Sequence, residues 1–144
     1  MSLLDSMNLV GSALTAERFR MDIALQNIAC ANITGTADSE PYRRKQVVFQ
    51  ERGMSFQDAL NNASAQVKGG GVRVTQVVES QRDFVPVYDP TNPNADEDGY
   101  VWHSNVNTTE ERVDLMSASN AYEANLTALK LVQNLALKAL DIGK

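Results

Sequence analysis

The C-terminal part of the sequence constrains the fold more than any other segment. Residues 108–143 contain no proline, and their one glycine is the last residue, so nothing before it breaks a helix. Apolar side chains recur at strict seven-residue intervals at Leu115, Tyr122, Leu129 and Ala136, which indicates a coiled-coil type of seam. At about 1.5 Å per residue this helix would be roughly 50 Å long. An apolar stripe of that length needs another long helix to cover it.

The first turn of this helix carries a start signal. Thr108 and Glu111 have the spacing of a capping box, in which two side chains accept hydrogen bonds from the backbone amides that a first turn leaves free. We therefore expect the helix to begin at Thr108, with Glu111 as the capping carboxylate.

A second long helical segment lies at the other end of the chain. The sequence from Leu3 to about Ala31 lacks proline, and it repeats the sevenfold spacing at Met7, Leu14, Met21 and Ile28. Both seams are rich in alanine, so two helices alone would bury little apolar area against the entropy lost on ordering them. We infer that neighbouring copies complete the packing, and that both ends are partly disordered before assembly.

Composition excludes several classes of protein. The chain has 144 residues and a net charge of −5, which argues against nonspecific binding of nucleic acid. No run of about 18 apolar residues exists, so direct membrane insertion is not expected. No basic region precedes the apolar residues at the N-terminus, so a cleaved signal peptide is not expected either. The single cysteine, Cys30, cannot form an internal disulfide.

The middle of the chain has the pattern of short strands. Tyr42–Glu51 is expected to be a strand with Val47 and Phe49 on one face and with Arg44 and Gln46 pointing away from it. Val72–Glu79 is a second strand, with alternating valines. Phe84–Tyr88 is a short extended run that Pro86 restricts to a sheet edge.

Three consecutive basic residues, Arg43, Arg44 and Lys45, begin the first of these strands. A phosphate-binding role is disfavoured because the rest of the chain is acidic. We expect either a solvated strand end or basic side chains that pair with acidic neighbours.

The segment between the first two strands is less informative. Ser55–Val67 has the spacing of a short amphipathic helix, although its composition also suits a surface segment. Gly69–Gly71 follow without the lysine and hydroxyl residue of a phosphate-binding loop, so we interpret them as a flexible turn.

Residues 89–99 form the most chemically suggestive turn. Asn94, Asp96, Asp98 and Gly99 match the first half of an EF-hand calcium loop, which leaves a small calcium-binding module as an alternative function. The match fails at its twelfth position, where Asn105 replaces the bidentate glutamate. Tyr100–His103 also has the pattern of a strand instead of an exiting helix. An ordinary turn that closes a hairpin is the simpler interpretation.

Catalytic motifs are absent from the sequence. His103 is the only histidine and Cys30 the only cysteine, so a metal site built on these residue types would lack further ligands. We expect no enzyme activity, no cofactor and no bound metal. A membrane-surface protein is a third hypothesis, but the polar helix faces carry mixed charge and few aromatic residues.

Together these patterns predict an α+β chain. The terminal helices, residues 1–33 and 108–144, are expected to pair as a coiled-coil-like inner domain. Residues 34–107 are expected to form a small β-rich middle region with loops.

Motifs along nearly the whole chain resemble a known family. The first group is Ser12–Ala16 with Arg20, Asn27–Ala29, Asn32 and Thr34, followed by Pro41–Phe49 and Gly71–Val74. The second group is Val87–Pro90 with Asn92–Pro93, Ala95–Asp96 and Asp98–Val101. The third group is Asn105–Asn107, Met116–Ser119, Ala121–Asn125 and Leu137–Leu140. In this order the motifs resemble the proximal rod proteins of the bacterial flagellar basal body, within the axial family of rod and hook proteins.

The resemblance implies a structural role without catalysis. Rod proteins build the hollow shaft that crosses the periplasm, transmits torque and lets exported subunits pass. The implied partners are other copies of the chain, other proximal and distal rod proteins, basal-body ring and rod-adaptor proteins, and the flagellar type III export apparatus. Export without a cleaved signal peptide and helical, head-to-tail assembly are implied as well.

The helix seams and the family motifs together indicate site residues. Subunit packing is expected from the seam residues Met7, Leu14, Met21, Ile28, Leu115, Tyr122, Leu129 and Val132. Polar contacts that fix the helix register are expected from Arg20, Asn27, Asn32, Glu123 and Asn125.

Overall fold

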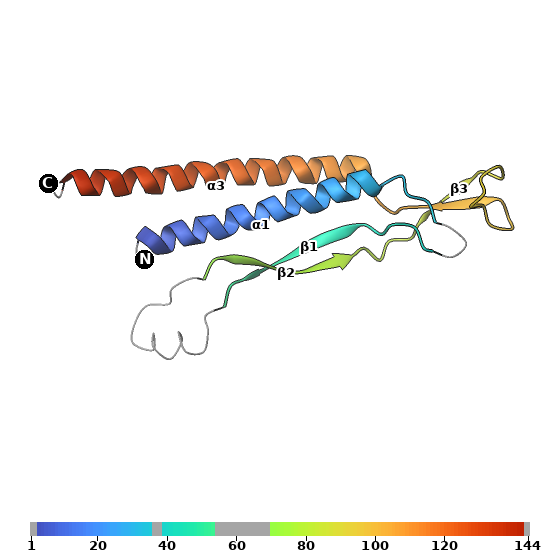
Figure 1. Cartoon of the computed structure of the whole chain (residues 1–144), viewed down its shortest axis with the longest axis horizontal. Coiled ribbons are helices and arrows are strands. Elements are labelled where there is room, and N and C mark those ends of the chain that lie inside the picture. Colours follow the sequence, from blue (N-terminus) through green and yellow to red (C-terminus); the bar gives the residue numbers. More distant parts are fainter. Residues whose placement is uncertain (1–2, 36–38, 54–69, 143–144) are drawn as a thin grey trace. The chain divides into compact units, whose positions relative to one another are not determined.

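The computed structural model describes residues 3–35, 39–53 and 70–142. In chain order the elements are α1 (Leu3–Cys30), β1 (Lys45–Glu51), β2 (Val72–Glu79), β3 (Val85–Tyr88), β4 (Tyr100–His103) and α3 (Thr108–Ile142) (Figure 1). This confirms the predicted α+β class, with a long helix at each end and a small β-rich middle. The helix expected over Ser55–Val67 lies outside the described residues. None of the described helices is long and apolar enough to span a membrane.

The strands form two separate antiparallel pairs. β1 pairs with β2, and backbone hydrogen bonds of 2.8 Å flank the pair, from Arg52 N–H to the Gly71 carbonyl and from Ser80 N–H to the Arg44 carbonyl. β3 pairs with β4 in a register that runs from Val85 opposite His103 to Tyr88 opposite Tyr100. The hairpin predicted around residues 89–99 is therefore confirmed.

The chain divides into two compact units, and each takes part of both helices. The first unit comprises Met1–Phe19, Val48–Gln76 and Ala118–Lys144, and the second comprises Arg20–Val47 and Val77–Ser117. Among the described residues, the buried side chains of the first unit are only alanines, Ala16 and Ala118. The second unit buries Ala24, Ala31 and Val101 together with Asn27, Arg44, Ser104, Asn105 and Glu111. Polar contacts therefore make up much of the interior of the second unit.

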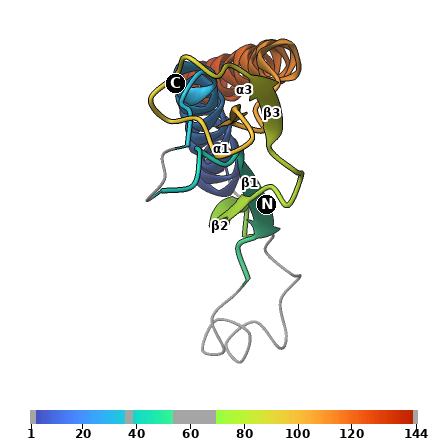
Figure 2. The same cartoon turned by 90° about the vertical axis from the view of Figure 1, so that its right-hand side faces the viewer.

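Within the second unit, the end of α1 lies beside the start of α3 in both views (Figure 2). The Arg20 guanidinium forms an ion pair with Asp114, and the Asn27 amide donates to the Glu111 carboxylate over 2.8 Å. These two contacts are two helical turns apart on α1, so they fix how the helix ends face each other.

The predicted strand Tyr42–Glu51 is wrong at its start. The strand begins at Lys45, and the Arg44 side chain is buried instead of pointing to solvent. A buried carboxylate partner explains the difference, because it compensates the cost of removing the guanidinium from water. Beyond this point the sequence pattern holds in β2, where Val72, Val74 and Val78 are half-buried as their alternation predicted.

The predicted capping box at Thr108 is also wrong, by one residue. The side-chain oxygen of Asn107 accepts hydrogen bonds from the N–H groups of Thr109 at 3.0 Å and Glu110 at 3.4 Å, so Asn107 caps α3. The Asn107 side-chain amide donates to the Glu110 carboxylate over 3.4 Å, so the carboxylate of Glu110 and not that of Glu111 contacts the capping residue. Glu111 is left free to enter the interior.

Replacing Asn107 by alanine is expected to lower the free energy of unfolding by about 1 kcal/mol. The substitution leaves two backbone N–H groups of the first turn without their acceptor. Urea unfolding would measure the loss. Asn107→Ser is the control, since serine is an equally good cap and should retain most of the stability; equal losses in both variants would contradict the assignment.

The glycine run interpreted as a flexible turn has a packing role where it is described. Gly71 adopts φ +81°, and an added Cβ would clash with the Ser12 Oγ of α1. The same hydroxyl accepts the Val72 N–H at 3.1 Å and donates to the Leu9 carbonyl at 2.7 Å. The glycine therefore lets β2 start in direct contact with the helix.

Candidate functional site

The amide of Asn27 is the centre of a buried polar network in the second unit. Its nitrogen donates to the Lys45 carbonyl and to the Glu111 carboxylate, both at 2.8 Å. Its oxygen accepts the Lys45 N–H at 3.0 Å and the Tyr42 hydroxyl at 2.9 Å. All four hydrogen bonds that an amide offers are thus made. Asn27 pairs with the Lys45 backbone through both groups, as a neighbouring strand would, and so attaches β1 to α1.

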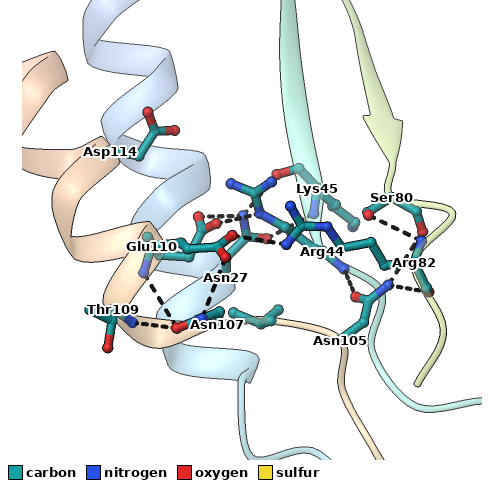
Figure 3. A network of polar contacts seen from close by, with 12 residues as sticks. Asn27, Arg44, Lys45, Ser80, Arg82, Asn105, Asn107, Thr109, Glu110 and Asp114 are labelled. Carbon is teal, nitrogen blue, oxygen red and sulfur yellow. Dashed lines mark hydrogen bonds and ion pairs between the residues drawn. The ribbon is translucent and has the colours of Figure 1, made fainter. Parts of the chain in front are cut away.

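A buried ion pair between Arg44 and Glu111 also belongs to this network and connects the start of β1 to α3. The Arg44 Nε lies 2.5 Å from Glu111 Oε1, and the Glu111 side chain is only 1% exposed. The second carboxylate oxygen accepts from Asn27, so both oxygens of Glu111 are engaged. Figure 3 shows the Arg44 side chain extending from the β1 end toward the helices. Because each charge is paired and hydrogen-bonded, the pair satisfies the conditions under which burial is tolerated.

Asn105 holds the neighbouring strand ends. Its side-chain oxygen accepts the Arg44 N–H at 2.7 Å, and its nitrogen donates to the carbonyls of Arg82 at 2.8 Å and Ser80 at 3.4 Å. In Figure 3, Asn105 lies between Arg44 and the chain that leaves β2. The residues Asn27, Arg44, Asn105 and Glu111, which we call the polar network, therefore join both helices to the start of β1 and to the chain that leaves β2.

Tyr42 is half-buried at the edge of the network and donates a hydrogen bond to it. Burial raises the pKa of Tyr42 to about 12, and electrostatic interactions with Cys30, Glu111 and Glu79 act in the same direction. The hydroxyl is therefore protonated at neutral pH and available to donate to Asn27. The donors and acceptors of the network are thus paired with one another. Such a network is suited to holding the helices and strands in fixed positions.

The structure brings together some of the predicted polar residues. Asn27 occupies the network centre, and Arg20 pairs with Asp114 on α3. Asn32 is exposed just beyond α1, Glu123 is exposed on α3, and Asn125 is half-buried there. The assignment of these three residues to register contacts stays a prediction.

The predicted seam residues share one environment. In the single chain each is half-buried: Met7, Leu14, Met21, Ile28, Leu115, Tyr122, Leu129 and Val132. Their role in packing between subunits stays a prediction. The end of α3 adds apolar side chains that the seam did not include, because Leu131, Leu135, Leu137 and Leu140 are 58–68% exposed. Exposed leucines at this density are typical of protein interaction surfaces.

Carboxylates of the acidic turn between β3 and β4 accept hydrogen bonds from within the turn. Asp96 accepts the N–H groups of Asp98 at 3.1 Å and Tyr100 at 2.8 Å, and Gly99 takes φ +78°. Hydrogen bonds from Thr91 lower the pKa of Asp89. In the described part of the chain, no three His, Cys, Asp or Glu side chains are grouped to hold a metal ion. The turn geometry accounts for these residues without a cation, and the calcium alternative gains no support.

The run of basic residues meets acidic neighbours, as one of the two interpretations predicted. Arg43 lies 3.3 Å from Glu40, and Arg44 pairs with Glu111. Sequence reasoning missed Arg44, Asn105 and Glu111 as interior residues. Arginine, asparagine and glutamate are common on exposed strands, in turns and at helix caps. No periodic pattern in the sequence indicates that these three residues are buried.

Comparisons with known proteins agree with the family motifs. The family model described as "Flagellar basal body rod FlgEFG protein C-terminal" matches residues 97–142. The "Flagellar basal-body rod protein FlgC" of Bacillus subtilis is 42% identical over 150 aligned residues, and the match covers 100% of both chains. Proteins of the same name from Escherichia coli O6:H1 and Salmonella typhimurium are each 42% identical over 144 residues, again over 100% of both chains.

Proposed function

The chain belongs to the family of the flagellar basal-body rod protein FlgC, and from this premise we propose that it is a structural subunit of the proximal rod. The full-length match to relatives of that name carries the proposal. In this role the chain assembles with other rod proteins into the hollow drive shaft, transmits torque and lets exported subunits pass. Its function is structural and requires no catalytic site.

The exposed end of α3 supports this role. Four leucines, Leu131, Leu135, Leu137 and Leu140, are more than half exposed in the single chain. A helix that is apolar on more than one side requires further helices around it. Neighbouring subunits supply such helices in a head-to-tail array, which forms helical assemblies instead of closed dimers. The eight half-buried seam residues would then complete their packing between subunits.

The same role defines partners and location. We place the chain in the periplasmic rod of the basal body, in contact with other copies, with proximal and distal rod proteins, and with ring and rod-adaptor proteins. Delivery would use the flagellar export apparatus without cleavage of a signal peptide. The polar network supports this role as well, because it fixes the faces of both helices that a neighbour would contact.

Deletion of the gene in the source bacterium tests the proposal. Cells without the chain are expected to lack hooks and filaments and not to swim, and complementation restores both. Basal bodies purified from the complemented cells should contain the chain in a fixed ratio to other rod proteins. A strain that lacks only the filament protein is the control, since its basal bodies should retain the chain. Swimming by the deletion strain, or basal bodies without the chain, would overturn the assignment.

A further inference from the structure

One face of the β3–β4 hairpin is aromatic and open to solvent. Pro86 lies opposite Trp102, and Tyr88 lies opposite Tyr100. Because side chains alternate along a strand, these four residues share a face. Tyr88 is 64% exposed, Tyr100 42% and Trp102 44%, and the two tyrosine rings make an edge-to-face contact at 5.4 Å. We call these four residues the hairpin face.

A cavity adjoins this face. Trp102 lines a space of about 800 Å³ together with Pro41, Phe84 and Pro93, and Asp96 and Glu97 contribute carboxylates to its wall. All of these residues belong to the second unit. The walls combine flat apolar surfaces with negative charge, which suits a long side chain with an apolar stem and a positive end.

The turn beside the cavity carries only negative charges. The sequence contains no Lys or Arg between Arg82 and Arg112, whereas the turn carries Asp89, Asp96, Glu97 and Asp98. The cavity wall already shows how a cation binds there, because the Arg43 guanidinium lies 4.2 Å from the centre of the Phe84 ring. Indole is the best ring for such a contact, and the same cavity exposes Trp102.

We propose that the hairpin face and its cavity bind a basic segment of another protein through Arg or Lys side chains that stack on Trp102 and Tyr88. Glu97 and Asp98 supply the complementary charge, since both are exposed and lie in the turn beside the cavity. This surface uses residues different from the leucines of α3, so it goes beyond the proposed assembly role.

Fluorescence of Trp102 tests the proposal directly, because it is the only tryptophan in the chain. Full-length protein is titrated with a capped tetra-arginine peptide, and a tetra-citrulline peptide of the same shape serves as the uncharged probe. A saturable change in emission is expected with arginine and none with citrulline. Removing two carboxylates in Glu97→Gln/Asp98→Asn should weaken binding about tenfold, and so should an increase in salt from about 20 mM to about 500 mM.

A matched variant distinguishes peptide binding at the hairpin face from general electrostatic attraction of the peptide to an acidic protein. Asp22→Asn/Asp141→Asn removes the same charge at exposed helix positions and should bind as the parent does. Tyr88→Ala should weaken binding without changing the net charge. Equal binding of both peptides, or equal weakening by both charge variants, would overturn the proposal. An emission change on concentrating the protein without peptide would overturn it too, because the occupant would then be a second copy.

Discussion

Replacing Glu111 by alanine is expected to lower the free energy of unfolding of the second unit by about 3–5 kcal/mol. The substitution leaves the Arg44 guanidinium buried without a counter-charge, and it removes the acceptor of one Asn27 donor. The cost of such an orphaned charge exceeds the net contribution of the pair. Urea unfolding followed by Trp102 fluorescence would measure it, since β4 belongs to the same unit.

The neighbouring residue provides the matched control. Glu110 forms an ion pair of 2.9 Å with Arg82, but the two side chains are 45% and 58% exposed. Water screens this pair, so Glu110→Ala should cost only about 0–1 kcal/mol. The two adjacent glutamates each pair with one arginine, but only the pair of Glu111 is buried. Similar losses in both variants would contradict the role assigned to the polar network.

A double substitution tests whether Arg44 and Glu111 act as a pair. Arg44→Leu/Glu111→Leu removes both charges together, so neither is left buried alone. Its destabilisation should be smaller than the sum of the two single substitutions, with a coupling within the range of about 0.5–3 kcal/mol. Additive losses would mean that each side chain contributes independently, against the geometry of a shared contact.

The helices and the hairpin could be predicted because their signals are local. Sevenfold apolar spacing without proline defined α1 and α3, and the proline and aspartate residues after Tyr88 defined the turn. These patterns act over a few residues and depend little on the rest of the fold. The leucines near the end of α3 are visible in the sequence. Their exposure could not be predicted, because it depends on which face of the helix the rest of the chain covers.

The polar network could not be predicted because its contacts join distant segments. Asn27 and Glu111 are 84 positions apart, and Arg44 and Asn105 are 61 apart. Sequence reasoning assigned Glu111 to the helix cap, which a first-turn glutamate usually serves. Asn107 caps the helix instead, and this shift by one residue turns Glu111 inward. Arg44 was placed in solvent by strand alternation, and its carboxylate partner overrides that pattern.

The polar network and the end of α3 represent two different requirements of one subunit. In the second unit, buried hydrogen bonds fix the helix faces without help from a partner. The described part of α3 in the first unit instead exposes leucines on several sides. The proposed role requires both, because contacts within the chain define the helix register and contacts with neighbouring subunits would cover the apolar area.

Substitution of Leu131 and Leu135 by glutamine is therefore expected to prevent incorporation into the rod while leaving the free subunit folded. The two residues lie one turn apart on the same side of α3, and both are exposed in the single chain. Glutamine matches leucine in helix propensity, so the helix itself should persist. Loss of two buried leucines at an interface corresponds to about 3–6 kcal/mol, or roughly 10²–10⁴-fold weaker association.

The measurement is the amount of the variant in purified basal bodies, with swimming as the second readout. Lys130→Gln/Asn134→Gln is the matched control, because it places the same residue at exposed polar positions next to the two leucines. The control should assemble normally, and circular dichroism should give equal helix content for both free proteins. Normal incorporation of the leucine variant would show that the end of α3 is not an assembly surface. A loss of helix content confined to that variant would instead mean that the leucines stabilise the free subunit, and the exposed surface would then have no role of its own in rod formation.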